Sequence, residues 1–534
     1  MPRSEVAVLQ DHLETLIRDS LWDTAFLHAR LALEKVATTS QAGQLLQACE
    51  QVPKELRLTL PWAGLLARLA FRANAPVVCA VYTDAWPTEL GALSAWVLMT
   101  RGDSLGALRA SEVASSEMGD LAGVAWRMRA WAIASLGHRG WEQAYRDAAG
   151  HNQGRQRGLC LIQLGAYLSF AGQQAEARTV YAEAGPYLRH DPELQANASY
   201  NVGVACLRLH HLDAAERAFQ EAMTAAARPE GLGMLARAWS GLGHVYRARA
   251  EYPRALHAYH TAQVKATEAG DVAQAGRGKA HTLRLTGQLD EALGTLYEAL
   301  YRLGEPDAHA LYADMAAVQV MLGDEVGAEA SLGRIPSGQE EEAQRAQVVR
   351  AELARRRAQL QVAEGLIHGF GTGALWSTEE ARLFPELFAL IGLCVMPPEP
   401  MVLSVQADGP VRVTLNRIRL PLYSDTPAAS LLALLASQGG HVTVEQAMAG
   451  LTLTGATERL RRQGLSRTLG VLRDVLGWPE AVETDGHTLS LDPRLRCQPV
   501  QFPAVSNDFC AGLDDPWIGA WREDHHELNV LLRS

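Results

Sequence analysis

The strongest constraint on this chain is an internal repeat. A small residue is followed 12 positions later by Ala, 16 positions later by an aromatic or apolar residue, and 19 positions later by a second Ala. The small residues of the four clearest copies are Gly165, Gly203, Gly243 and Ala280, which lie 37 to 40 residues apart. A period of this length indicates a solenoid in which each helical hairpin packs mainly on its neighbours.

The small residues have a steric reason. Two antiparallel helices approach closely only where the facing side chains are small, and the aromatic residues then fill the gap to the next hairpin. Weaker copies centre on Ala95, Ala132 and Ala316. Together the copies predict seven repeat units over residues 85–335.

The third of the clear copies also carries a known set of positions. Its residues are Trp239, Leu242, Gly243, Tyr246, Tyr252, Ala255, Tyr259 and Ala262. They resemble the tetratricopeptide repeat (TPR) nearly one for one. The resemblance implies a mainly α fold, a TPR-like α-solenoid whose concave surface is lined by the first helix of each hairpin and binds partners.

The segments on either side of the repeats are less regular. Residues 1–84 have helical apolar spacing without a clear repeat, which predicts degenerate N-terminal hairpins. Residues 336–396 are expected to form linker or capping helices, and we interpret the charged stretch from Glu340 to Arg357 as a helix with a solvated face. Residues 501–534 are expected to be a C-terminal tail.

Composition excludes several classes of protein. Apolar residues make up 48% of the 534 residues, so the chain is not of the disordered type. The longest near-apolar run, residues 387–396, is too short to span a membrane, and residues 1–16 lack a signal-peptide pattern. We therefore expect a soluble, cytoplasmic protein that does not bind membranes. The seven scattered cysteines form no C-x-x-C pair, which argues against a disulfide framework and a zinc knuckle.

A different pattern follows the proline-rich residues 397–400. Alternating apolar residues over 402–422 predict a short antiparallel sheet, and a hairpin with an Asp485-Gly486 turn is predicted over 482–491. Between them we expect three helices, which begin at Pro427, at Val444 and near Thr457. This order predicts a small α+β domain over residues 401–500.

Several short motifs in this domain have a recognisable order and spacing. They are Leu431-Leu-Ala-Leu-Leu435, Gly440-His-Val-Thr443, Leu460-Arg-Arg462, Leu465-Ser-Arg467 and Leu472-Arg-Asp-Val-Leu-Gly477. Residues 401–492 thereby resemble the winged helix-turn-helix of the OmpR type, as found in the SARP-type bacterial transcriptional activators. Those activators place this domain before their TPR part, whereas it follows the repeats here. The resemblance implies transcription regulation through double-stranded DNA.

The third predicted helix has two contrasting faces. Leu465, Leu469, Leu472 and Leu476 fall on one side at ~100° per residue and must face the core. The rest of the helix is basic, because residues 457–473 hold five Arg and one acid. The candidate DNA-binding residues, including one on the hairpin, are Arg459, Arg461, Arg462, Gln463, Ser466, Arg467, Arg473 and His487. The alternative is a solvated basic helix that touches no DNA.

The TPR resemblance also places cationic residues in the groove of the solenoid. The implied ligand- or partner-binding residues are Asn201, Arg208, Arg237, His244, Arg247, Arg277, His281 and Arg284. Converging arginines can hold a carboxylate or phosphate, so the groove is predicted to bind a peptide, a protein or a small anionic ligand. The alternative is that these residues are solvated and paired with nearby acids.

Enzyme motifs are not found in the sequence. It contains no phosphate-binding loop, no H-E-x-x-H and no G-x-S-x-G, and we expect no catalytic residues, no metal and no cofactor. Two function classes remain. One is a DNA-binding regulator with a sensing solenoid, and the other is a TPR interaction scaffold whose winged helix contacts proteins. Homodimerisation is open in either case.

Overall fold

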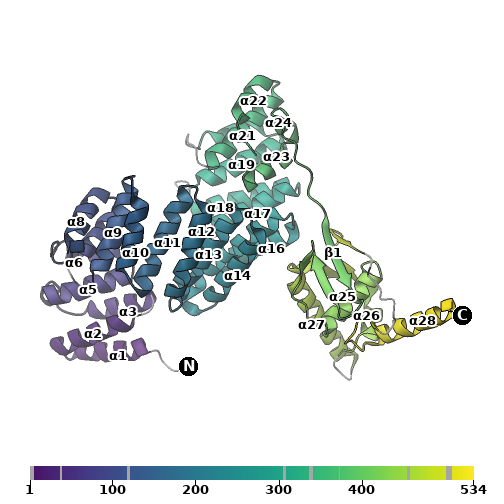
Figure 1. Ribbon diagram of the computed structural model, residues 1–534, viewed down its shortest axis with the longest axis horizontal. Coiled ribbons are helices and arrows are strands. Elements are labelled where there is room, and N and C mark those ends of the chain that lie inside the picture. Colours follow the sequence, from purple (N-terminus) through teal and green to yellow (C-terminus); the bar gives the residue numbers. More distant parts are fainter. Residues whose placement is uncertain are drawn as a thin grey trace. The chain divides into compact units, whose positions relative to one another are not determined.

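The computed structural model describes residues 5–36, 39–116, 121–304, 308–335, 341–371, 373–453, 457–498, 500 and 508–533. The chain divides into two compact units, Met1–Leu242 with Lys265–Thr267, and Gly243–Val264 with Glu268–Ser534. Helices dominate both units, and the strands are confined to the last part of the second (Figure 1). The expected fold class, a TPR-like α-solenoid followed by a small α+β domain, is confirmed.

The first unit is a series of helix hairpins in which most helices pack on the next one along the chain. Its buried side chains are mainly Leu, Ala and aromatic residues. The last helix, α15, crosses the boundary between the units. The elements are α1 (Glu5–Arg18), α2 (Trp22–Lys35), α3 (Thr39–Cys49), α4 (Lys54–Arg57), α5 (Leu60–Arg72), α6 (Pro76–Thr83), α7 (Gly91–Thr100), α8 (Ser104–Ser116), α9 (Ala122–Ser135), α10 (Trp141–His151), α11 (Gly154–Phe170), α12 (Gln174–Leu188), α13 (Pro192–Arg208), α14 (Leu212–Ala226), η1 (Pro229–Met234) and α15 (Leu235–Ala248).

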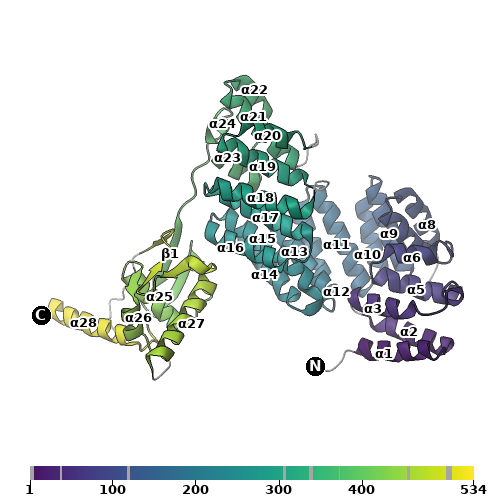
Figure 2. The ribbon, with the colours of Figure 1, turned by 180° about the vertical axis from the view of Figure 1, so that it is seen from behind.

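The second unit begins with further helix hairpins and ends with a small α+β domain. Seen from behind, the ribbons of α17 to α22 stack one on another, and α23 and α24 run beside them (Figure 2). The helical elements are α16 (Tyr252–Lys265), α17 (Ala269–Leu285), α18 (Leu289–Leu303), α19 (His309–Leu322), α20 (Glu325–Leu332), α21 (Glu341–Arg356), α22 (Leu360–Ile367), α23 (Leu375–Leu383) and α24 (Pro385–Ala389).

Glycines let aromatic rings lock successive hairpins together. A Cβ atom on Gly203 would lie 2.6 Å from the ring of Phe219, and one on Gly241, in the following repeat, would overlap the same ring. Tyr259 repeats this arrangement between Gly243 and Gly278. Each ring therefore fills a space that two glycines leave open, which confirms the steric role predicted for the small residues.

Helix α21 bears out one expectation from the sequence only in part. Its charged residues were expected to form a solvated face, but Arg345 and Glu352 are buried. The reason is that α21 forms a hairpin with α22 and also packs on α19, as a repeat helix does. These two side chains are paired inside the protein, since Arg345 bonds to Asp314 and Glu352 accepts from Arg355 and Arg356, whereas Glu341, Arg350 and Arg356 are exposed.

The C-terminal α+β domain has two small sheets. The first has the strand order β3-β2-β1-β7, with β7 parallel to β1 and the other pairs antiparallel, and the second is the antiparallel sheet β4-β6-β5. Leu403 pairs with Leu415 and Val405 with Val413, so one face of the first sheet is apolar and buried. The strands are β1 (Met401–Gln406), β2 (Arg412–Leu415), β3 (Ile418–Arg419), β4 (His441–Thr443), β5 (Val482–Thr484), β6 (Thr488–Leu491) and β7 (Leu495–Cys497).

The helices of this domain begin close to where the sequence predicts. They are α25 (Pro427–Ser437), α26 (Val444–Gly450) and α27 (Glu458–Leu476), followed by η2 (Pro479–Ala481). Thr457 caps α27, and Gly477 ends it in a left-handed conformation at φ 98°. Part of the expected tail also joins the domain: Phe509, Leu513 and Ile518 are buried in its core, and α28 (Pro516–Arg533) packs against α26. No helix in the described ranges is long and apolar enough to cross a membrane.

The glycine packing predicts opposite effects on stability for two Gly→Ala substitutions. We expect Gly278→Ala to destabilise the protein by about 1–3 kcal/mol, because its methyl group must displace the ring of Tyr259. Gly294→Ala on α18, where a Cβ would meet nothing, should stabilise it by about 0.5–1 kcal/mol through helix propensity. Urea unfolding followed by circular dichroism measures both changes, and equal shifts of the midpoint would contradict the proposed packing role.

Candidate functional sites

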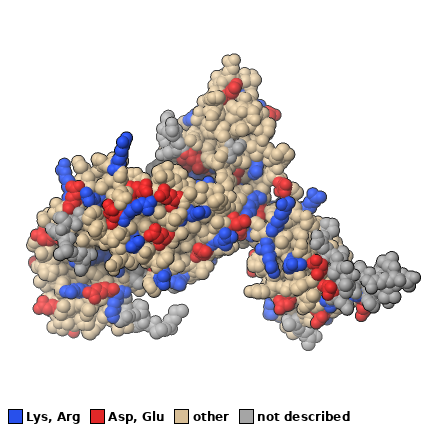
Figure 3. All heavy atoms as spheres, viewed as in Figure 1, with Lys and Arg blue, Asp and Glu red and all other residues tan. Residues whose placement is uncertain are grey.

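The first candidate site is the outer face of α27. The apolar stripe of this helix is buried as the sequence predicts, with Leu465, Leu469, Leu472 and Leu476 in the domain core. The predicted residues Arg459, Gln463, Ser466 and Arg467 are exposed on the side away from this stripe, and Arg461 and Arg462 are exposed at its edges. Glu458, Arg459, Arg462, Gln463 and Ser466 line a shallow open depression. Basic side chains gather where α27 lies on the surface of this domain (Figure 3).

Three of the predicted DNA-binding residues have other contacts. Arg462 pairs with Glu458 at 2.9 Å, and both side chains are exposed. Arg473 is half-buried and donates from Nε and Nη2 to the carbonyl oxygen of Val482, at 2.9 and 2.7 Å, so it fastens α27 to β5. His487 is exposed on the β5–β6 hairpin, and its carbonyl accepts from the backbone N–H of Val444.

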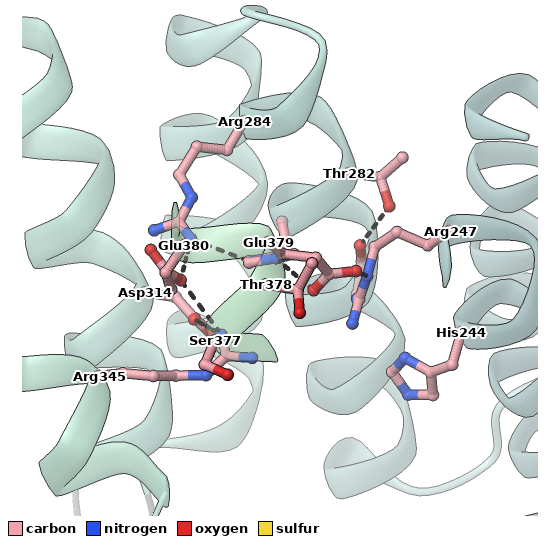
Figure 4. A network of polar contacts seen from close by, with 12 residues as sticks. His244, Arg247, Thr282, Arg284, Asp314, Arg345, Ser377, Thr378, Glu379 and Glu380 are labelled. Carbon is pink, nitrogen blue, oxygen red and sulfur yellow. Dashed lines mark hydrogen bonds and ion pairs between the residues drawn. The ribbon is translucent and has the colours of Figure 1, made fainter. Parts of the chain in front are cut away.

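The second candidate site is the groove of the solenoid in the second unit. The groove is not open to solvent here, because α23 of the same chain lies in it. The carboxylates of Glu379 and Glu380, on α23, point in two directions toward cationic residues of the repeat helices (Figure 4). These helices are α15, α17 and α21, each the first helix of its hairpin.

Glu379 is bound by the first group of residues. Its Oε1 accepts from Arg247 Nε at 2.9 Å, and its Oε2 lies 2.9 Å from His281 Nε2. Arg247 also donates to the hydroxyl of Tyr259 at 3.1 Å, and that hydroxyl lies 2.7 Å from His244 Nδ1. The aromatic residue that locks two repeats together thus also orients a groove arginine.

Glu380 is bound by the second group. It accepts a hydrogen bond from Arg284 Nη2, and its carboxylate lies 3.9 Å from Arg345 Nη1. Arg345 in turn donates to Asp314 on α19 at 3.1 Å, and Asp314 accepts from Arg277 at 2.8 Å. The two groups are joined through His281, whose Nδ1 lies 3.1 Å from Arg284 Nη2.

Burial and neighbouring charges together set the protonation of His281 and Glu379. Burial and the nearby Arg284 lower the pKa of His281 to about 4, against the opposing effect of Glu379. Burial alone would raise the pKa of Glu379, but Arg247 and His281 outweigh it and hold this pKa well below its usual range. His281 is therefore neutral at pH 7, which fits a ring that donates from Nε2 to Glu379 and accepts at Nδ1 from Arg284.

The structure brings together only part of the predicted groove site. His244, Arg247, Arg277, His281 and Arg284 contribute to the network just described. Asn201, Arg208 and Arg237 belong to the first unit. There Asn201 donates to Asn197 at 2.9 Å and Arg208 donates to Ser169 at 2.8 Å.

The acidic half of this site is not among the residues predicted from the sequence. Asp314 had a usable signal, because it follows its partner Arg277 by 37 residues, which is one repeat. Glu379 and Glu380 had none, since 132 residues separate Glu379 from Arg247 and 96 separate Glu380 from Arg284. Among the described residues no group of three or more His, Cys, Asp or Glu side chains could hold a metal ion.

Similarity to known proteins is found only among solved structures. No protein-family model matches the chain, and no curated protein matches it. Among solved structures, a tetratricopeptide repeat protein from Parabacteroides merdae is 14% identical over 57% of this chain and 98% of its own, with a TM-score of 0.32. A Rap protein complexed with competence and sporulation factor is 14% identical over 72% of this chain and 98% of its own, with a TM-score of 0.40.

A third similar structure is a signal transduction ATPase with a tetratricopeptide repeat sensor from Pyrococcus horikoshii. It is 15% identical over 64% of this chain and 54% of its own, with a TM-score of 0.43. By its own geometry, the solenoid of this chain has a TPR-like repeat architecture.

The lowered pKa of His281 predicts a loss of stability in acid. Between pH 6.5 and about 4 the unfolded chain binds a proton at this residue that the folded chain does not, so the free energy of unfolding falls as the pH falls. For this residue the loss is about 2 kcal/mol at pH 5. Glu379, whose folded pKa is depressed, adds a further loss only below its unfolded pKa of about 4.3.

The variant His281→Gln isolates this contribution, because the amide can still donate to Glu379 and accept from Arg284 but does not titrate. Urea unfolding at pH 7 and pH 5 should show a smaller loss for the variant than for the wild-type protein. Equal losses would show that His281 is not held neutral in the folded chain.

Proposed function

We propose that this chain is a DNA-binding transcriptional regulator whose solenoid groove binds a peptide or protein partner. The observation that carries the DNA-binding half is the division of α27 into two faces. One side is a buried leucine stripe, and the other exposes Arg459, Gln463 and Arg467, residue types that pair with guanine and adenine edges. The order of α25, α26, α27 and the β5–β6 hairpin supports a winged helix-turn-helix, in which the third helix enters the major groove.

Gly470 supports the same face. It lies on α27 in line with Gln463 and Arg467, and a Cβ atom there would meet nothing within 4 Å. A glycine inside a helix costs about 0.5–1 kcal/mol relative to alanine, and none of the described residues packs against this position closely enough to require it. Close approach of a DNA backbone to the helix would explain it.

The DNA-binding half is tested on the full chain with a selected DNA site in a gel-shift assay. Arg459→Ala and Arg467→Ala should each weaken binding roughly 5- to 150-fold if they contact bases, as the loss of such a contact costs about 1–3 kcal/mol. Arg496→Ala is the matched control. It removes an exposed arginine from β7, in the four-stranded sheet, and should change DNA affinity little. Sequence-independent or absent binding by the wild-type chain would favour the interaction scaffold instead.

Gly470→Ala gives a second, independent outcome. It should raise the stability of the helix by about 0.5–1 kcal/mol and weaken DNA binding in the same assay. If stability rises and DNA affinity stays unchanged, the backbone of α27 does not approach DNA at this position.

A further inference from the structure

Helix α23 carries two buried carboxylates into the groove, while its Trp376 and Leu383 are partly buried against the apolar core. Its buried side chains are Ser377, Glu379, Glu380 and Ala381, so only one of them is apolar. Trp376 adds a partly buried ring, which lies below the guanidinium of Arg345 at 5.7 Å and against Phe370. A helix that served only to fill the core would be expected to bury an apolar stripe instead.

The cations of the groove depend on this helix for neutralisation. Among the described residues, the only carboxylates that Arg247, His281 and Arg284 contact are Glu379 and Glu380. The side chain of Arg284 is 1% exposed, and an unpaired charge at such depth is strongly destabilising. If α23 left the groove, these residues would therefore require another pair of anionic groups.

The fit between α23 and the groove is incomplete. In the part of the chain that the structure describes, Glu380 Oε2 and Arg284 Nε are buried and have no hydrogen-bond partner. A buried polar atom without a partner costs free energy that a better-fitting group would recover. Buried ion pairs also often contribute less net stability than apolar packing of the same volume, because both charged groups lose their hydration.

We propose that Arg247, His281 and Arg284 form a binding site for two adjacent carboxylates of an acidic peptide, and that α23 occupies this site as an internal competitor. A partner protein presents a segment with two consecutive acidic residues and binds by displacing α23. This proposal rests on the groove-binding half of the proposed function and is independent of DNA binding.

The test uses the full chain and a fluorescent peptide that copies residues 374–384, Ala-Leu-Trp-Ser-Thr-Glu-Glu-Ala-Arg-Leu-Phe. The double variant Glu379→Gln/Glu380→Gln keeps the shape of α23 but removes the charges that hold it. We expect this variant to bind the peptide at least 10-fold more tightly than the wild-type chain does. A peptide with Gln in place of both glutamates should bind neither chain.

Glu386→Gln is the matched control. It removes one carboxylate from the exposed side chain on α24 that pairs with Arg355, so peptide affinity should remain at the wild-type level. Adding Arg284→Gln to the double variant should abolish peptide binding. Equal affinity of the double variant and the wild-type chain, or equal affinity for the acidic and the Gln peptide, would overturn the proposal.

Hydrogen exchange on the wild-type chain decides the matter if the double variant does not fold. Excess acidic peptide should accelerate exchange of the backbone amides in residues 375–383, whereas the Gln peptide should not. Unchanged exchange with both peptides would overturn the proposal. Neither readout involves DNA. A negative peptide result would therefore not bear on DNA binding by α27, and a negative gel-shift result would not bear on peptide binding in the groove.

Discussion

The close approach of successive hairpins around aromatic rings is the constraint on which the rest of the solenoid depends. Phe219 and Tyr259 each occupy a space bounded by two glycines from successive first helices, and a side chain at any of these glycines would force the helices apart. This packing sets the spacing of the groove wall. It also fixes the hydroxyl of Tyr259, which contacts both Arg247 and His244, so the scaffold and the groove share one residue.

The groove shows how a protein can bury several arginines without leaving them unpaired. Four arginines contribute to the network. Glu379, Glu380 and Asp314 supply opposite charge from α23 and α19, and Glu341 and Glu342 supply more from α21. The histidine between them stays neutral and connects the two groups by donating on one side and accepting on the other. Burial alone would raise the pKa of Glu379, and the charges arranged around it reverse that effect.

The sequence predicts the features that arise from local or periodic patterns. The repeat period, the leucine stripe of α27 and the helix starts near Pro427 and Val444 follow from spacing and capping, and the structure confirms them. The occupant of the groove does not follow from such patterns, because Glu379 meets Arg247 across 132 residues. The repeat pattern indicates that cationic side chains converge in the groove. The acidic side chains of α23 that neutralise them come from a segment outside the predicted repeats. The same holds for β7, which joins β1 from the far end of the domain.

Helix α23 begins soon after α22 ends, with only residues 368–374 between them. A short tether of this kind holds a segment near its site at an effective concentration in the millimolar range. A peptide from solution therefore competes with a segment that is covalently attached beside the groove. Its apparent affinity is the intrinsic affinity multiplied by the fraction of chains in which the groove is free. The tether thus sets a threshold: the groove responds only to a partner that is abundant or that fits better than α23 does.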